Sequence, residues 1–178
     1  MEHQEGLYQL FVEELEDMFS GEHQIVDSLP KLINLASSKD LIEALTKHLK
    51  ETKDQVKRIE RIFSILGLTP KSITCKGMEG LLQEAEELVG SRTKSPTTDA
   101  AIICAAQKVE HYEIASYGTL RCFAEQLDLD SEIPDLLDKS INEEGAADKA
   151  LTKIAKGSIF FGGVNQKAAE VGAPSGRR

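Results

Sequence analysis

Residues 100–127 read AAIICAAQKVEHYEIASYGTLRCFAEQL, a largely apolar helical run with two acidic residues, Glu110 and Glu113, near its middle. At about 100° per residue, Glu110 and Glu113 fall on the same face as Tyr117 and the apolar residues around it. A buried carboxylate without a partner costs several kcal/mol, so it must be protonated, paired with a base or bound to a metal ion. We interpret this stretch as one part of a metal site whose other ligands lie elsewhere in the chain.

The composition is that of one folded, highly charged domain: 178 residues, 40% hydrophobic and 29% charged. Basic residues are interspersed among the acidic ones and the net charge is −9, which argues against nucleic acid or a membrane as a partner. No apolar run approaches the roughly 20 residues that span a bilayer. The acidic N-terminus is unlike a signal peptide, and an odd number of cysteines without a C-x-x-C pair favours a reduced chain. We expect a cytoplasmic protein.

Apolar residues at helical spacing predict four long helices and no persuasive strand. The helices cover about residues 4–36, 37–66, 100–127 and 130–157. Pro30 is expected to kink or break the first of them. Ser37, followed by Asp40, resembles a capping box at the start of the second.

The connection between the second and third long helices, residues 67–95, is much longer than a helical hairpin turn. Apolar residues between Met78 and Val89 predict a short helix within it. Such a crossover carries the chain from one end of a bundle to the other, so we expect the second and third long helices to be parallel. The predicted fold is all-α: a four-helix bundle over residues 1–160, with a long crossover containing a short fifth helix, and a C-terminal tail over residues 161–178.

Each long helix carries at least one inward carboxylate near its middle, and few basic residues lie on the same faces. Two divalent metal ions would neutralise this charge, which is the di-iron or di-manganese arrangement of ferritin-like bundles. His48 also points inward, although a hydrogen-bonded core histidine is the commoner explanation for such a residue. The candidate metal ligands are Glu22, His48, Glu51, Glu110, Glu113, Glu144 and Asp148.

This ligand set departs from the usual pattern, in which two of the helices carry Glu-x-x-His. Neither Glu51 nor Glu144 is followed by a histidine at that spacing. Replacements are available in His48 or Gln55 on the second helix, Glu113 on the third and Asp148 on the fourth. A site this rich in oxygen suits Mn²⁺ or Fe²⁺ better than Zn²⁺ or copper. The missing histidines are also compatible with one weak or lost metal position.

Several stretches resemble a known family: LPK at residues 29–31, HLKET at 48–52, QV at 55–56, CKGMEGL at 75–81 and, most specifically, QKVEHYEIASYGTL at 107–120. On these motifs, residues 7–156 resemble the ferritin-like YciF/YciE stress proteins of bacteria. The resemblance implies a ferritin-like bundle, a homodimer, a di-metal centre and a link to stress response. It implies no defined biochemical activity.

Three functions compete. The leading hypothesis is a dinuclear Mn or Fe protein acting on peroxide or oxygen, in which Glu22, Glu51, Glu110 and Glu144 bind or bridge the ions. Glu113 and Asp148 would then complete the coordination or move protons, and no catalytic residue is assigned. The second hypothesis is metal sequestration without turnover, and the third is a stress-induced helical scaffold whose buried acids form a hydrogen-bonded, partly protonated network.

Overall fold

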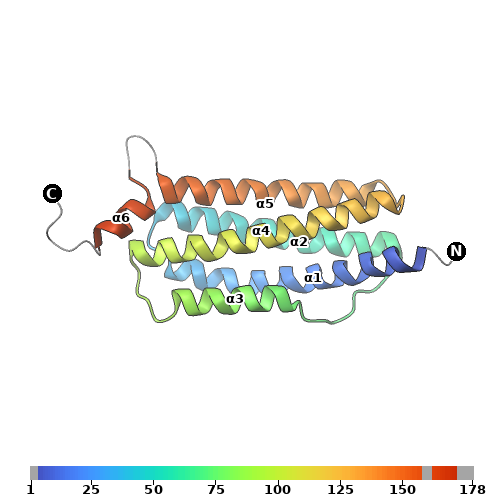
Figure 1. Ribbon diagram of the computed structural model, residues 1–178, viewed down its shortest axis with the longest axis horizontal. Coiled ribbons are helices and arrows are strands. Elements are labelled where there is room, and N and C mark those ends of the chain that lie inside the picture. The colour runs from blue at the N-terminus through green and yellow to red at the C-terminus, as the bar shows by residue number, and fades with distance from the viewer. Residues whose placement is uncertain (1–3, 158–161, 172–178) are drawn as a thin grey trace.

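The computed structural model describes residues 4–157 and 162–171, and within them the regular secondary structure is entirely helical. Four long helices lie side by side along the molecule, with a shorter helix on the outside and another at one end (Figure 1). The helices are α1 (Gln4–Leu35), α2 (Lys39–Leu66), α3 (Lys76–Val89), α4 (Pro96–Gln126), α5 (Glu132–Lys156) and α6 (Val164–Val171).

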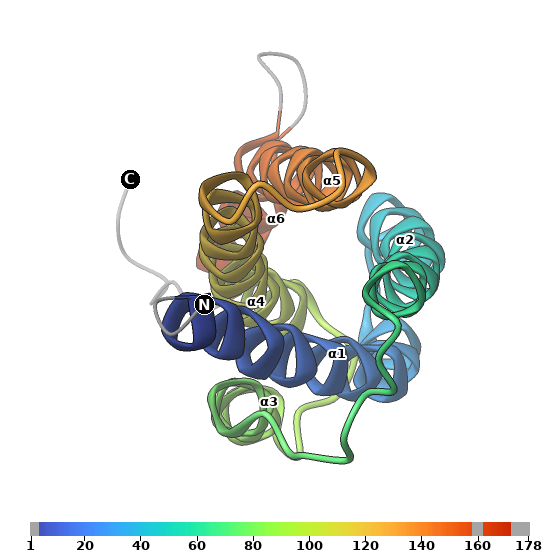
Figure 2. The ribbon, with the colours of Figure 1, turned by 90° about the vertical axis from the view of Figure 1, so that its right-hand side faces the viewer.

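The long helices form a closed ring of neighbours. Helix α1 contacts α2 and α4, and α5 contacts the same two helices from the opposite side (Figure 2). Neighbouring helices run in opposite directions, whereas α2 and α4 run in the same direction (Figure 1). The long crossover therefore makes α2 and α4 parallel, as its length predicted. Its short helix, α3, packs on the outside against α1 and α4.

The interior is divided into three layers along the helix axes. One apolar cluster contains Ile25 from α1 and Leu45 from α2; the other contains Leu15 from α1 and Ile59 from α2. Buried polar residues lie between these clusters on every long helix: Glu22, Thr52, Gln55, Glu110, Glu113, Ser140 and Glu144. Each long helix thus has an apolar stripe with a polar interruption at the same height.

Helix α1 does not break at Pro30, which is exposed, so the carbonyl that loses its intrahelical partner can be hydrated. The predicted cap of the second helix was wrong. Helix α2 has Ser38 as its N-cap, and that side chain makes no capping hydrogen bond. Asp99 of α4 does the capping instead: its carboxylate accepts hydrogen bonds from the backbone N–H groups of Ser37 and Ser38, at 2.7 and 3.0 Å, and from the Ser37 hydroxyl at 2.6 Å.

Part of the predicted C-terminal tail is helical. Helix α6 packs against α4 and α5, and its first residue, Val164, is buried. The rest of that tail, residues 172–178 and residue 161, lies outside the described part of the chain. None of the described helices is long and apolar enough to cross a membrane.

We predict that Asp99→Ala will lower the free energy of unfolding by about 2 kcal/mol, because it removes a buried, charged cap from three donors at once. Urea unfolding followed by circular dichroism measures the change. Asp40→Ala, at an exposed acidic residue in the first turn of α2, is the control and should cost less than half as much. Equal losses in the two variants would contradict the assignment of Asp99 as the cap.

Candidate metal centre

Four side chains from three helices converge in the middle layer. His48 of α2, Glu110 and Glu113 of α4, and Glu144 of α5 each offer one ligand atom, and these atoms all lie within 4.8 Å of one another. All four residues are at most 5% exposed. Glu110 and Glu113 of α4 point in similar directions because they are three residues apart, which is nearly a full helical turn. We call these four residues the His–Glu cluster.

The fourth long helix, α1, contributes Glu22 beside the cluster. Glu22 is fully buried and accepts a hydrogen bond from the phenolic hydroxyl of Tyr117, which is also fully buried. The negative charge of Glu22 is one cause of the raised pKa of Glu113. Glu22 is therefore electrostatically coupled to the cluster.

Most of the potential ligand atoms make no hydrogen bond with the protein. Both oxygens of Glu113, both ring nitrogens of His48, and one oxygen each of Glu22, Glu110 and Glu144 are buried without a partner. His48 approaches two of the acids, with Nε2 at 3.4 Å from Glu110 Oε1 and Nδ1 at 3.9 Å from Glu144 Oε2. Buried polar atoms are ordinarily satisfied, so a group of unpaired acceptors at one point indicates a place for a cation.

Burial dominates the electrostatics of these acids. Desolvation, followed by the nearby charge of Glu144, raises the pKa of Glu110 to about 11. Desolvation also raises the pKa of Glu22, but only to about 8, because the hydrogen bond from Tyr117 favours its charged form. The pKa of Glu113 is raised well above its usual range, first by burial and then by the charges of Glu144 and Glu22. A divalent cation would oppose these shifts, because its charge favours the ionised carboxylates.

A hydrogen-bonded network holds Glu144 in place from the side of α2. The amide nitrogen of Gln55 donates to Glu144 and, at 3.4 Å, to Glu143. Arg58, buried one turn further along α2, donates to both carboxylate oxygens of Glu143 and to the hydroxyl of Ser140 at 2.7 Å. This network fixes one acidic ligand and neutralises a buried guanidinium at the same time.

Besides Glu22, two predicted ligands lie outside the His–Glu cluster. Glu51 is half-buried at the edge of α2 and pairs with Lys47, because a helix whose His48, Thr52 and Gln55 face inward turns residue 51 aside. The carboxylate of Asp148 on α5 accepts a hydrogen bond from Gln107 at 2.9 Å and lies 3.5 Å from Nε2 of the exposed His111. Asp148 remains close enough for its charge to raise the pKa of Glu110.

Sequence reasoning named Gln55 as a replacement ligand but missed Arg58, Ser140 and Glu143. Arg58 follows Gln55 by three residues, a spacing that places both on one side of α2. An arginine three residues beyond an inward glutamine was thus a usable signal. Its partners on α5 were not identifiable, since their pairing with Arg58 depends on how two helices face each other.

Comparison with known proteins supports the resemblance. A family model described as a domain of unknown function, DUF892, matches residues 6–169. The chain belongs to this family. It is 43% identical to protein YciF of Escherichia coli K12 over 160 residues. This alignment covers 89% of this chain and 93% of the relative.

Two solved structures of relatives are similar to the whole helical unit. The E. coli stress protein YciF matches with a TM-score of 0.79 and 42% identity, over 83% of this chain and 92% of that chain. YcfI from Rhodopseudomonas palustris matches with a TM-score of 0.80 and 41% identity, over 84% of this chain and 94% of that one. The resemblance to the YciF family that the sequence indicated is therefore confirmed.

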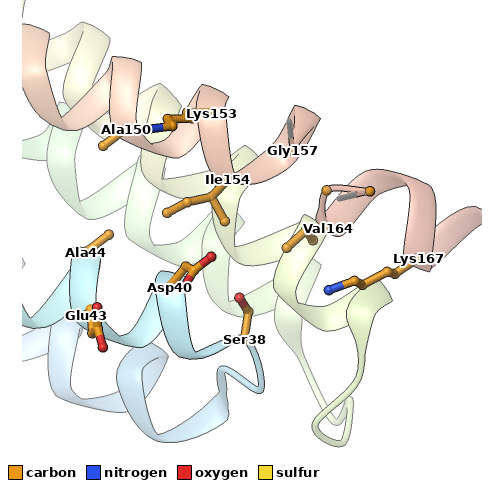
Figure 3. Close-up of a pocket in the computed structure, with 12 residues that line it drawn as sticks. Ser38, Asp40, Glu43, Ala44, Ala150, Lys153, Ile154, Gly157, Val164 and Lys167 are labelled. Carbon is orange, nitrogen blue, oxygen red and sulfur yellow. The ribbon is translucent and has the colours of Figure 1, made fainter. Parts of the chain in front are cut away.

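A separate cavity lies at one end of the molecule, where the start of α2, the end of α5 and the start of α6 meet (Figure 3). Its volume is about 510 Å³, and its lining includes Asp40 and Glu43 from α2, Lys153 from α5 and Lys167 from α6. These charges are of both signs and are distributed around an open space. No member of the His–Glu cluster lines this cavity, so we treat it as unrelated to the centre.

The raised pKa values predict how the metal-free protein responds to pH. Between the ordinary pKa of glutamic acid, 4.5, and about 8, folded Glu22 and Glu110 retain protons that the unfolded chain releases. Stability is therefore greatest below the unfolded pKa and falls as pH rises toward the folded values, by about 1.4 kcal/mol per pH unit for each retained proton. Glu110→Gln should therefore reduce the slope of the free energy of unfolding against pH by about 1.4 kcal/mol per pH unit, the contribution of one retained proton.

Urea unfolding at several pH values from about 5 to about 8, with a chelator present, tests this expectation. Glu14→Gln, on the exposed face of α1, is the matched control and should leave the slope unchanged. A wild-type slope near zero, or the same slope in Glu110→Gln, would show that the buried acids do not retain protons.

Proposed function

We propose that this protein is a ferritin-like four-helix bundle that binds two divalent metal ions, Mn or Fe, in its middle layer. The observation that carries the proposal is the convergence of buried, unpaired carboxylate oxygens and a histidine from all four long helices. The donor set fits such ions, because carboxylates with one imidazole suit Mn²⁺ and Fe²⁺. Metal binding would also neutralise acids whose burial is otherwise costly.

The two ions would share Glu113. His48, Glu110 and Glu144 would hold one ion, and Glu22 would hold the other. Glu113 is the candidate bridge because neither of its oxygens has a hydrogen-bond partner and the charges of Glu22, Glu110 and Glu144 all act on it. This assignment leaves out Glu51 and Asp148, whose carboxylates have partners outside the cluster.

When bound, a pair of Mn or Fe ions supplies one-electron redox chemistry toward peroxide or oxygen. The chain's own residues would orient the ligands and handle protons. Gln55 holds Glu144 in position, and the Tyr117 hydroxyl and the Glu22 carboxyl form a buried pair that can hold a proton next to the centre. The apolar layers on both sides would keep bulk water away from it.

The names of the relatives indicate the cellular role in which this activity would operate. YciF of E. coli is named a stress protein. By likeness to that family we propose that this chain acts in bacterial stress response, in the cytoplasm and as a homodimer, on a small oxidant. A metal-sequestering role without turnover would use the same centre.

One observation favours a different function, that of a non-catalytic helical scaffold. Hydrogen bonds already join Gln55 to Glu144 and Tyr117 to Glu22, and the raised pKa values of Glu22, Glu110 and Glu113 would allow these acids to remain neutral. Eight buried atoms in the same layer nevertheless remain without partners. This is the stronger observation, and it favours metal.

We predict that Glu113→Gln will reduce bound metal from about two ions per chain to less than one, because the bridge to both positions loses its charge. Elemental analysis of protein purified from cells supplied with both iron and manganese gives the number directly. Glu51→Gln is the control: it is an identical change one turn from His48, at a carboxylate paired with Lys47, and it should retain the full metal content. Folded wild-type protein with no metal above background would favour the scaffold.

A further inference from the structure

A small cavity reaches the His–Glu cluster from the side of α1, α3 and α4. Its volume is about 20 Å³, and it ends at His48 and Glu110. We propose that this cavity is the entry chamber for molecular oxygen, so that the centre's oxidant is an apolar diatomic gas rather than peroxide. The inference rests on the proposed metal centre for its functional meaning, but the chamber can be tested without any metal.

The chamber has the size and lining that such a molecule needs. A volume of about 20 Å³ exceeds the roughly 10–15 Å³ that one water-sized molecule requires. Its walls are mostly buried aliphatic side chains, which include Ala85 of α3 and Ala105 and Ala106 of α4. Apart from the two cluster residues at its inner end, the one polar residue in the lining is Ser28 of α1.

A surface groove adjoins the chamber. This groove, of about 330 Å³, lies between α1 and α3 and shares two lining residues with the chamber, Ser28 and Leu82. Both shared residues are half-buried, so they form the wall between solvent and the interior. The exposed ion pair of Lys31 and Glu86, at 3.0 Å, lies over the groove and links α1 to α3.

The apolar lining of the chamber favours the entry of dioxygen over that of hydrogen peroxide. Hydrogen peroxide would have to give up its hydrogen bonds to water and find only the Ser28 hydroxyl on the way in, whereas dioxygen has no such bonds to lose. At the inner end the molecule would meet His48 and Glu110, each at least nine-tenths buried and each with polar atoms that lack partners. The chamber therefore joins an apolar route to a polar, ligand-bearing end.

Paramagnetic relaxation by dissolved dioxygen tests the proposal directly. The full chain is treated with a chelator, because bound Mn or Fe would itself broaden the signals, and methyl relaxation is compared under oxygen and under nitrogen. The Ala106 methyl should relax several-fold faster under oxygen than that of Ala155. Both alanines are 7% exposed and belong to the same apolar cluster, but only Ala106 lines the chamber.

Ser28→Leu tests the route, because it replaces the small residue in the shared wall with a larger apolar one. It should remove most of the oxygen effect at Ala106, while Ser64→Leu, the same change at an exposed position of α2, should not. Amide spectra establish that both variants are folded, and the comparison of Ala106 with Ala155 in the wild type needs no variant.

Equal relaxation of the two methyl groups in the wild type would overturn the proposal, as would a tightly held water in the chamber. Persistence of the effect in folded Ser28→Leu would overturn the route through the groove. Metal content, measured separately, tells failure of the chamber from failure of the centre. Normal metal with no oxygen contact rejects the chamber alone, and oxygen contact without metal rejects the proposed function alone.

Discussion

The burial of several acidic side chains in one water-poor layer is the constraint on which the rest of this structure depends. Glu22, Glu110, Glu113 and Glu144 are each at most 1% exposed, and His48 is almost as buried. Apolar clusters above and below them keep the layer dry, which increases the cost of any charge there. The same dryness makes a bound cation more strongly attracted than it would be in water. The apolar packing that stabilises this helical fold would thus also strengthen the layer's affinity for metal.

The surrounding structure supports that layer in several independent ways. Arg58 brings a positive charge into the interior but is satisfied by Glu143 and Ser140, so it holds α2 against α5 without occupying the cluster. Asp99 joins the start of α2 to α4 and fixes the relative height of two helices that carry candidate ligands. Helix α3 covers the joint between α1 and α4, and the chamber beneath it is lined by Glu110 at its inner end. Rigid helices, rather than loops, carry all the candidate ligands.

Much of the fold could be predicted from periodicity alone. Apolar spacing located the four long helices and α3, and the length of the crossover predicted that α2 and α4 are parallel. The inward positions of Glu22, Glu110, Glu113 and Glu144 also follow from helical wheels, because these residues lie near the centres of their stripes. Glu51 lies about 60° from His48 on the wheel, and at that angle a glutamate can turn either to the interior or to a neighbouring lysine. Such flanking positions are decided by neighbours that a wheel does not contain.

By itself, the sequence determined the helices, their apolar faces and the height at which acidic residues interrupt them, because these depend on spacing along a single chain. Only the tertiary structure decided which side chains meet. It selected His48 over Glu51, paired Arg58 with Glu143, replaced the local cap at Ser37 by Asp99, and turned residues 164–171 into a helix packed on α4. The physical reason is the same in each case. A helix fixes directions about its own axis, but contacts between helices depend on their rotation and offset, which the packing of the whole interior sets.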